Sequence, residues 1–342
     1  MPIVKKNLPV IIISIITVLL IIRFSLHRFP GTYIKLTGFT QGTTYQITYK
    51  SKDKLNLQDE IDTLLADFDR SLSTYLPGSI ISRINRNDTT ARPDDHFLKV
   101  YHKALEVYEE TDGAFDITIA PIVNAWGFGF TEKADVDSNM IDSLLQYVGM
   151  NKISLVEGKI IKKYTGTMLD VNAIAQGYSV DVASDFLDKK GIRNYLVDIG
   201  GEVRTKGRNP EYKTWIIGID KPVDNNFIPG EMIQAKLLLK DGSIATSGNY
   251  RSFYEQDGIK YAHSIDPGTG YPVLDNLLSA TVQASDCMTA DAYATAFMVM
   301  GLDKTIQFLS EHEQLQAYLI FSDKDGNMKT FVTKKLRRKL RE

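Results

Sequence analysis

The stretch "MTADAYATAFMVMG", residues 288–301, predicts a helix that packs into the protein interior, because most of its residues are apolar or small. It nevertheless carries Asp291 and Thr295, whose spacing of four residues places both side chains on one helix face. A buried carboxylate without a partner is unfavourable. The pair is either structural, with Asp291 near the positive end of the helix dipole and Thr295 bonded to a backbone carbonyl, or it meets a ligand.

The composition indicates an ordinary globular protein. The chain has 342 residues, of which 43% are hydrophobic and 24% charged, and this length allows one large domain or two. Its net charge of -2 gives no electrostatic case for a nucleic-acid partner. The single cysteine, Cys287, excludes an internal disulfide and a cysteine-built zinc site, and the five histidines lack the spacing of a zinc motif.

The two ends of the chain differ from the rest. The uncharged run "LPVIIISIITVLLII", residues 8–22, is typical of a secretion signal or a short membrane anchor. No small-residue cleavage site follows it, so we predict an uncleaved signal anchor, a transmembrane segment within residues 1–30. Residues 31–333 then form the main domain. Residues 334–342 form a basic tail, for which we expect a solvated extension, with contact to anionic lipid as the alternative.

The periodicity of the main domain favours an α+β fold. Residues 44–50 alternate like a strand, whereas residues 57–72 and 94–113 have helical spacing, the latter closed by Gly113. More strands are expected in three apolar segments and in a closing hairpin that turns at Asp325 and Gly326: residues 194–200, 214–220, 232–240 and 316–333. Strands outnumber long helices and do not alternate with them, which predicts mixed or antiparallel sheets flanked by helices.

Two segments combine glycine with polar residues. In "TDGAFDITIAPIVNAWGFGF", residues 111–130, Asp116 and Thr118 follow a glycine, and aromatic residues alternate with two later glycines. These aromatics either stack on a flat ligand or are plain core. In "LDVNAIAQGYSVD", residues 169–181, Asp170 is expected at a strand end before a helix starting at Ile174. Such a junction exposes backbone N–H groups that suit phosphate and carbonyls that suit a hard cation.

The densest segment is "IATSGNYRSFYEQDGIKYAHSIDPGTGYP", residues 244–272. It holds a hydroxyl-rich turn at residues 246–248 and places His263 just before the proline turn at Asp266. A histidine held by a rigid turn is a candidate general base, since its pKa lies near neutral pH. The alternative is a hairpin whose histidine caps local structure. Together with the paired glycines of residues 200–201, these segments suggest a nucleotide-like ligand.

Six motifs in order, over roughly residues 38–333, resemble the ApbE family of FAD:protein FMN transferases. They are "QGTTYQITY", "DRSLSTYLPGSIISRIN", "DGAFDITIAPIVNAWGFG", "LDVNAIAQGYSVD", the segment 244–272 and "ADAYATAFMVMG". The resemblance implies an α+β body with FAD in a cleft between lobes. It also implies an Mg²⁺-dependent enzyme that moves the FMN part of FAD onto a threonine or serine hydroxyl of a partner protein and releases AMP. FAD hydrolysis to FMN and AMP, and flavin binding without turnover, are the alternatives.

The resemblance also implies roles for individual residues. Asp291 and Thr295 would bind the metal together with the backbone carbonyl of Ala173, and His263 would be the base for the incoming hydroxyl. Asp291, Thr295 and His263 argue against mere binding, which needs neither a metal nor a base. The FAD contacts would be Gln41, Tyr75, Ala114, Phe115, Asp116, Asp170, Gln176 and Ile265.

Three positions depart from the family's pattern. Gln41 stands where the family often has methionine, Gln176 where it often has lysine or glutamate, and Ala294 where some members carry a further acidic ligand. The family's lipid-attachment cysteine is also missing, which supports a signal anchor. The family's setting implies the outer, periplasmic side of a bacterial inner membrane, with a subunit of a membrane redox complex as acceptor. The sequence does not identify that acceptor.

Overall fold

The computed structural model describes residues 16–18, 31–130, 134–223, 230–249, 253–256, 259–262 and 264–341. The predicted anchor therefore lies outside the described residues, apart from three helical residues at 16–18. Within the described part, no helix is both long enough and apolar enough to span a membrane.

An antiparallel sheet of eight strands forms the centre of the fold, in the spatial order β1-β2-β5-β6-β9-β12-β13-β14. The strands are β1 (Thr32–Thr40), β2 (Thr43–Ser51), β5 (Tyr195–Ile199), β6 (Glu202–Lys206), β9 (Gly242–Gly248), β12 (Leu277–Ala284), β13 (Gln316–Ser322) and β14 (Met328–Val332). The spatial order follows the chain order, which is the pattern expected when strands pair antiparallel with their predecessors. The α+β prediction is confirmed, and the sheet is antiparallel.

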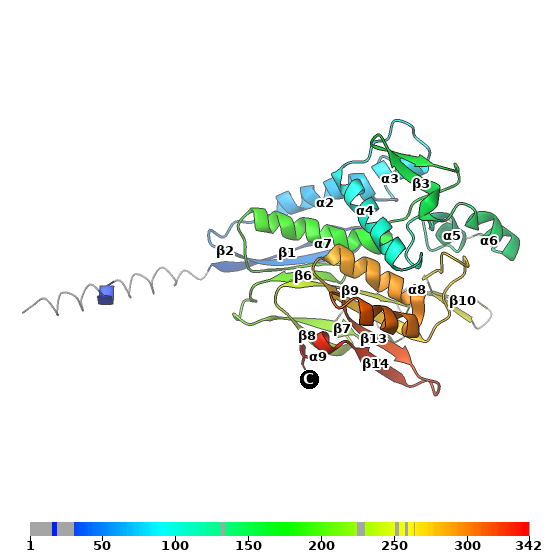
Figure 1. The fold of residues 1–342 in the computed structure, drawn as a ribbon. Coiled ribbons are helices and arrows are strands. Elements are labelled where there is room, and N and C mark those ends of the chain that lie inside the picture. The colour runs from blue at the N-terminus through cyan, green and yellow to red at the C-terminus, as the bar shows by residue number, and fades with distance from the viewer. Residues whose placement is uncertain are drawn as a thin grey trace, which may run out of the picture.

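Helices cover one face of this sheet, with α2, α7 and α8 running across it in Figure 1. The helices are α2 (Gln58–Leu72), α3 (Ile80–Asn85), α4 (Asp95–Glu110), α5 (Ala120–Ala125), α6 (Ser138–Leu145), the short η1 (Met150–Lys152), α7 (Asn172–Lys189), α8 (Cys287–Glu311) and α9 (Lys334–Arg337). The alternation of β2 explains this layer, because Tyr45, Ile47 and Tyr49 all point to the helices and pack with Ile61 and Leu65 of α2.

A smaller sheet covers the opposite face. Its strands are β7 (Trp215–Asp220), β8 (Ile233–Leu239) and β15 (Leu340–Arg341), in the order β15-β8-β7. Leu237 and Leu239 of β8 pack with Val203 and Ile244 of the large sheet. Two separate hairpins complete the strands: β3 (Ile153–Val156) with β4 (Lys159–Lys162), and β10 (Phe253–Gln256) with β11 (Ile259–Ala262).

The expectation of a solvated C-terminal tail is wrong. Leu336 of α9 is fully buried in the cluster between the two sheets, and Leu340 pairs with Leu237. Leu336 and Leu340 are the apolar residues among the basic ones: Leu336 lies in α9, whereas Leu340 lies in β15 of the small sheet and is partly buried. The basic side chains around them occupy the outer side, so a charge-rich segment still completes the core.

Helix α8 extends the predicted helix beyond Gly301, but Gly301 itself leaves the helical conformation, with φ 76° and ψ 176°. At its start, Asp286 accepts a hydrogen bond from the backbone N–H of Thr289. Asp181 of α7 accepts further bonds from the N–H groups of Cys287 and Met288. These two carboxylates satisfy the free N–H groups of the first turn and orient α8 against α7.

Candidate active site

The contact between α7 and α8 determines where Asp291 points. The N–H of Gly177 donates to Oδ2 of Asp291 over 2.9 Å. A Cβ atom at position 177 would lie 2.4 Å from the Cys287 carbonyl oxygen and 2.6 Å from the Asp291 Cβ. Only glycine therefore allows the two helices to approach closely enough for this bond.

Asp291 is a buried carboxylate without a cationic side chain beside it. It is 6% exposed, and burial raises its pKa to about 7, although the bond from Gly177 acts in the opposite direction. No lysine or arginine of the described residues forms an ion pair with it. A carboxylate in this position is ready to bind a cation.

Thr295 and Ala173 share a cavity with Asp291. The cavity has a volume of about 350 Å³ and lies between α7, α8, the end of β9 and the loops around Phe115 and Ile265. The hydroxyl groups of Thr295 and of Ser247 on β9 lie 3.0 Å apart, so Ser247 orients Thr295. Residues 246–248, expected as a turn, are the end of this strand. One carboxylate, one hydroxyl and one carbonyl form the oxygen-only set that Mg²⁺ accepts.

Residues far apart in the sequence complete the walls of this cavity. Five of the eight expected FAD contacts line it: Ala114, Phe115, Asp116, Asp170 and Ile265. Asn172 joins them, and its N–H donates to Oδ1 of Asp170 over 2.8 Å. The sequence predicted Asp170 at the end of a strand, and this is wrong. Met168, two residues earlier, forms only an isolated bridge with Ile119. Asp170 lies directly before α7, where the helix dipole favours its charge.

Asp116 is held rigidly in the cavity wall. Its Oδ1 accepts bonds from both the N–H and the hydroxyl of Thr118, at 2.7 and 2.6 Å. Burial raises the pKa of Asp116 to about 6, while the two bonds from Thr118 oppose that shift. Burial likewise raises the pKa of Asp170. Several carboxylates with raised pKa values around one cavity are typical of a functional site.

The sequence pattern of the ApbE family matches residues 41–319. The chain belongs to the ApbE family.

Relatives match nearly the whole chain. The FAD:protein FMN transferase of Vibrio cholerae is 37% identical over 306 residues, which cover 87% of this chain and 90% of that protein. The FAD:protein FMN transferase of Haemophilus influenzae is 37% identical over 317 residues, 88% of this chain and 89% of that protein. The solved structure of the flavin transferase ApbE from Vibrio cholerae aligns with a TM-score of 0.81 and 35% identity, covering 90% of this chain and 99% of that one.

Three expected FAD contacts lie outside the walls of the cavity. Tyr75 is 63% exposed, and its hydroxyl lies near Asn172 and Asp170, two residues of the cavity wall, so Tyr75 stands beside the cavity. Gln41 occupies the turn between β1 and β2 with φ 51°, and its Oε1 accepts a bond from Ser179. Gln176 donates Nε2 to Glu202 and to the carbonyl of Ile199, and points away from the cavity.

Glu202 is a residue that sequence reasoning missed. It is buried beside Gln176, and its pKa is raised well above the usual range by burial and by the charge of Asp291. Glu202 directly follows the glycine pair 200–201, but nothing in that motif indicates that it approaches α8. The aromatic residues of the motif 111–130 have different surroundings. Phe128 lines the cavity, whereas Trp126 belongs to the core and donates its Nε1–H to the carbonyl of Gly270. His263 lies outside the described residues and stays a predicted base.

Proposed function

We propose that this chain is an FAD:protein FMN transferase that moves FMN from FAD to a threonine or serine hydroxyl of a partner protein. The observation that carries this proposal is that Ala173, Asp291 and Thr295 line the same cavity as five of the expected FAD contacts. The names of the ApbE relatives support the same reaction.

Mg²⁺ fits the oxygen atoms of Ala173, Asp291 and Thr295, because Asp291 is buried without a cationic partner among the described residues. When bound, Mg²⁺ would offset the charge of the pyrophosphate and of the leaving phosphate. The protein keeps this donor set in place: Gly177 orients the carboxylate of Asp291, and Ser247 orients the hydroxyl of Thr295. Asn172 and Ala173 begin α7 at the cavity, so the helix dipole favours phosphate there.

In the proposed reaction, the acceptor hydroxyl oxygen attacks the phosphorus atom of the FMN half of FAD. A new oxygen–phosphorus bond forms, the pyrophosphate bond breaks, and AMP leaves with the bridging oxygen. His263 is the expected acceptor of the hydroxyl proton. Phe115 and Phe128 in the walls, and Tyr75 beside the cavity, offer aromatic faces for the ring systems of FAD.

The proposal includes anchoring by the apolar run of residues 8–22 and a catalytic domain on the periplasmic side of a bacterial inner membrane. An acceptor in a membrane redox complex would then share that surface. This part rests on the sequence and on the family's expected setting.

The test mixes the full chain with FAD, Mg²⁺ and a threonine-containing acceptor peptide, and mass spectrometry detects an FMN adduct. Asp291→Asn keeps an oxygen for the bond from Gly177 but removes the charge, so we expect adduct formation to fall about 10²–10⁴-fold, as for His263→Ala. Asp303→Asn on the exposed side of α8 is the matched control. Free FMN and AMP without an adduct would replace the proposal by hydrolysis, and intact FAD by flavin binding alone.

A further inference from the structure

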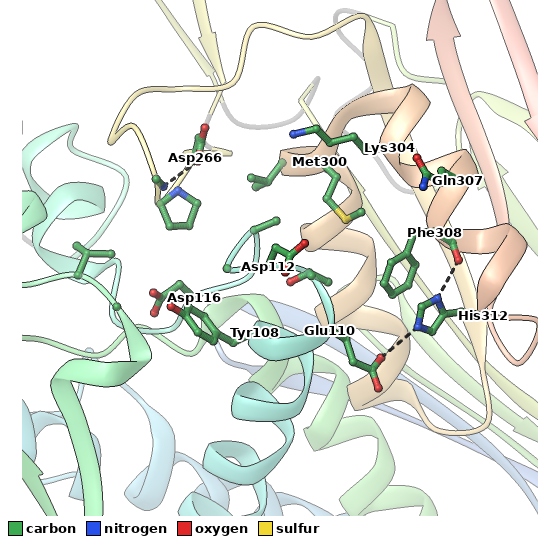
Figure 2. A pocket seen from close by; sticks show the side chains of 18 of the residues that line it. Tyr108, Glu110, Asp112, Asp116, Asp266, Met300, Lys304, Gln307, Phe308 and His312 are labelled. Carbon is green, nitrogen blue, oxygen red and sulfur yellow. Dashed lines mark hydrogen bonds and ion pairs between the residues drawn. The ribbon is translucent and has the colours of Figure 1, made fainter.

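A second cavity, of about 580 Å³, adjoins the first, and Figure 2 draws side chains that line it. Its walls come from the end of α4 and the loop after it, from residues 266–268, and from the second half of α8. Ala114, Asp116, Pro267 and Val299 line both cavities. Anything bound in the second cavity therefore lies next to the FAD cavity.

The charge of the second cavity is strongly one-sided. Five carboxylates line it, and we call this surface the acidic groove: Glu110, Asp112, Asp116, Asp266 and Glu311. The basic residues that line the same cavity are Lys304 and His312. His312 is already engaged, since its ring stacks on Phe308 at 3.8 Å and its Nε2 lies 4.0 Å from Glu110 (Figure 2). A pyrophosphate would be repelled here, and a cationic chain would be attracted.

Asp116 adds a buried acceptor at the junction of the two cavities. Asp116 is only 7% exposed, and both hydrogen bonds from Thr118 end on its Oδ1. Oδ2 receives no hydrogen bond from any residue that the structure describes. Oδ2 is also absent from the fully buried unpartnered atoms of the described residues, so water or a molecule in the cavity can reach it and donate to it. The groove thus combines a distributed negative charge with a specific acceptor.

The groove also has apolar surface for the rest of a bound chain. Tyr108, Met300 and Phe308 lie among the carboxylates (Figure 2). Lysine and arginine suit such a surface, because their aliphatic stems pack on apolar atoms while their cationic ends reach carboxylates.

We propose that the acidic groove binds the acceptor polypeptide beside its target hydroxyl, through lysine or arginine side chains of that polypeptide. This inference rests on the proposed transferase function and specifies its acceptor. A chain lying in the groove brings neighbouring residues over Asp116 and Pro267, at the border of the FAD cavity, where the hydroxyl must arrive.

The experiment uses two fluorescent peptides that share one central threonine and differ only in flanking residues, two lysines in one and two glutamates in the other. Binding to the full chain saturated with FAD is measured by anisotropy without Mg²⁺, and FMN adducts by mass spectrometry with Mg²⁺. The variant Asp112→Asn/Glu311→Gln removes two groove charges. Asp112 has φ 50°, a conformation that asparagine also adopts readily.

The control variant Asp303→Asn/Glu313→Gln removes two charges outside the groove. Both residues are exposed, and Glu313 pairs with Lys335 at the surface. The two variants have the same net charge, so a difference between them reports the groove and not the overall field of the protein.

We expect the lysine peptide to bind at least about tenfold more tightly than the glutamate peptide. The groove variant should lose roughly tenfold in affinity for the lysine peptide and raise its KM with little change in kcat, whereas the control changes both less than about twofold. The affinity for FAD should stay unchanged in both variants.

Equal binding of the two peptides, or equal loss in both variants, would overturn the proposal. So would a loss of FAD affinity in the groove variant, because the groove would then belong to the FAD site. Groove-dependent binding without any FMN adduct would refute the transferase function and leave the groove assignment standing. FMN adducts that form equally with both peptides and in both variants would refute acceptor binding by the groove and leave the transferase function standing.

Discussion

Asp116→Asn measures how much the buried charge of Asp116 in the cavity wall destabilises the fold. Both bonds from Thr118 end on Oδ1, so the amide oxygen of asparagine can accept them unchanged. The substitution removes the charge while keeping the shape and the hydrogen bonds. It therefore measures the desolvation of the carboxylate almost alone.

The size of the effect follows from the pKa. Folding raises the pKa of Asp116 from its ordinary value of 3.8 to about 6, which at 1.36 kcal/mol per pKa unit corresponds to roughly 3 kcal/mol. Below about pH 3 the group is protonated in both states and has no effect on stability. As the pH rises, the unfolded chain ionises first, so the native state loses stability until the folded group ionises as well. The penalty is roughly 1.5 kcal/mol at pH 5 and levels off near 3 kcal/mol above pH 7.

The assay is urea unfolding of the full chain and of the variant at several pH values between 4.5 and 8. We expect the free energy of unfolding of Asp116→Asn to exceed that of the natural chain by an amount that grows with pH and then becomes constant. Subtracting the two curves removes all other titrating groups. A difference that does not change with pH, or that falls as pH rises, would show that Asp116 is not a desolvated carboxylate.

Two further predictions concern packing. Gly177→Ala places a Cβ against the Cys287 carbonyl and Asp291, so it should lower the free energy of unfolding by about 1–3 kcal/mol and weaken Mg²⁺-dependent turnover. Gly78→Ala is the control: its Cβ position has open space around it, so both assays should change little. Leu336→Ala should lower the free energy of unfolding, measured in urea, by about 2–4 kcal/mol because Leu336 is fully buried between the sheets. The exposed Arg338→Ala should change it by less than about 0.5 kcal/mol, and equal effects would mean that the tail does not belong to the core.

Local patterns of the chain predicted most of the secondary structure. The alternation of residues 44–50, the helical spacing of 57–72 and 94–113, and the hairpin turn at Asp325 and Gly326 all appear in the structure. These patterns reflect which side chains face water and which face the core, so they can be read from neighbours in the sequence. The basic tail misled for the same reason, because its many charges outweigh Leu336, which is buried between the sheets, and Leu340, which pairs with Leu237.

The sequence alone also indicated the family and the candidate residues of the site. A carboxylate and a hydroxyl four residues apart on an apolar helix singled out Asp291 and Thr295, and the ordered motifs resembled the ApbE family. The surroundings of these residues follow from tertiary packing. Gly177 reaches Asp291 from a helix 114 positions away, Glu202 comes within the electrostatic reach of Asp291, and Gln176 turns to Glu202 and not to the cavity. Such contacts depend on how sheets and helices pack, and a chain carries no local signal of distances between residues that folding alone brings together.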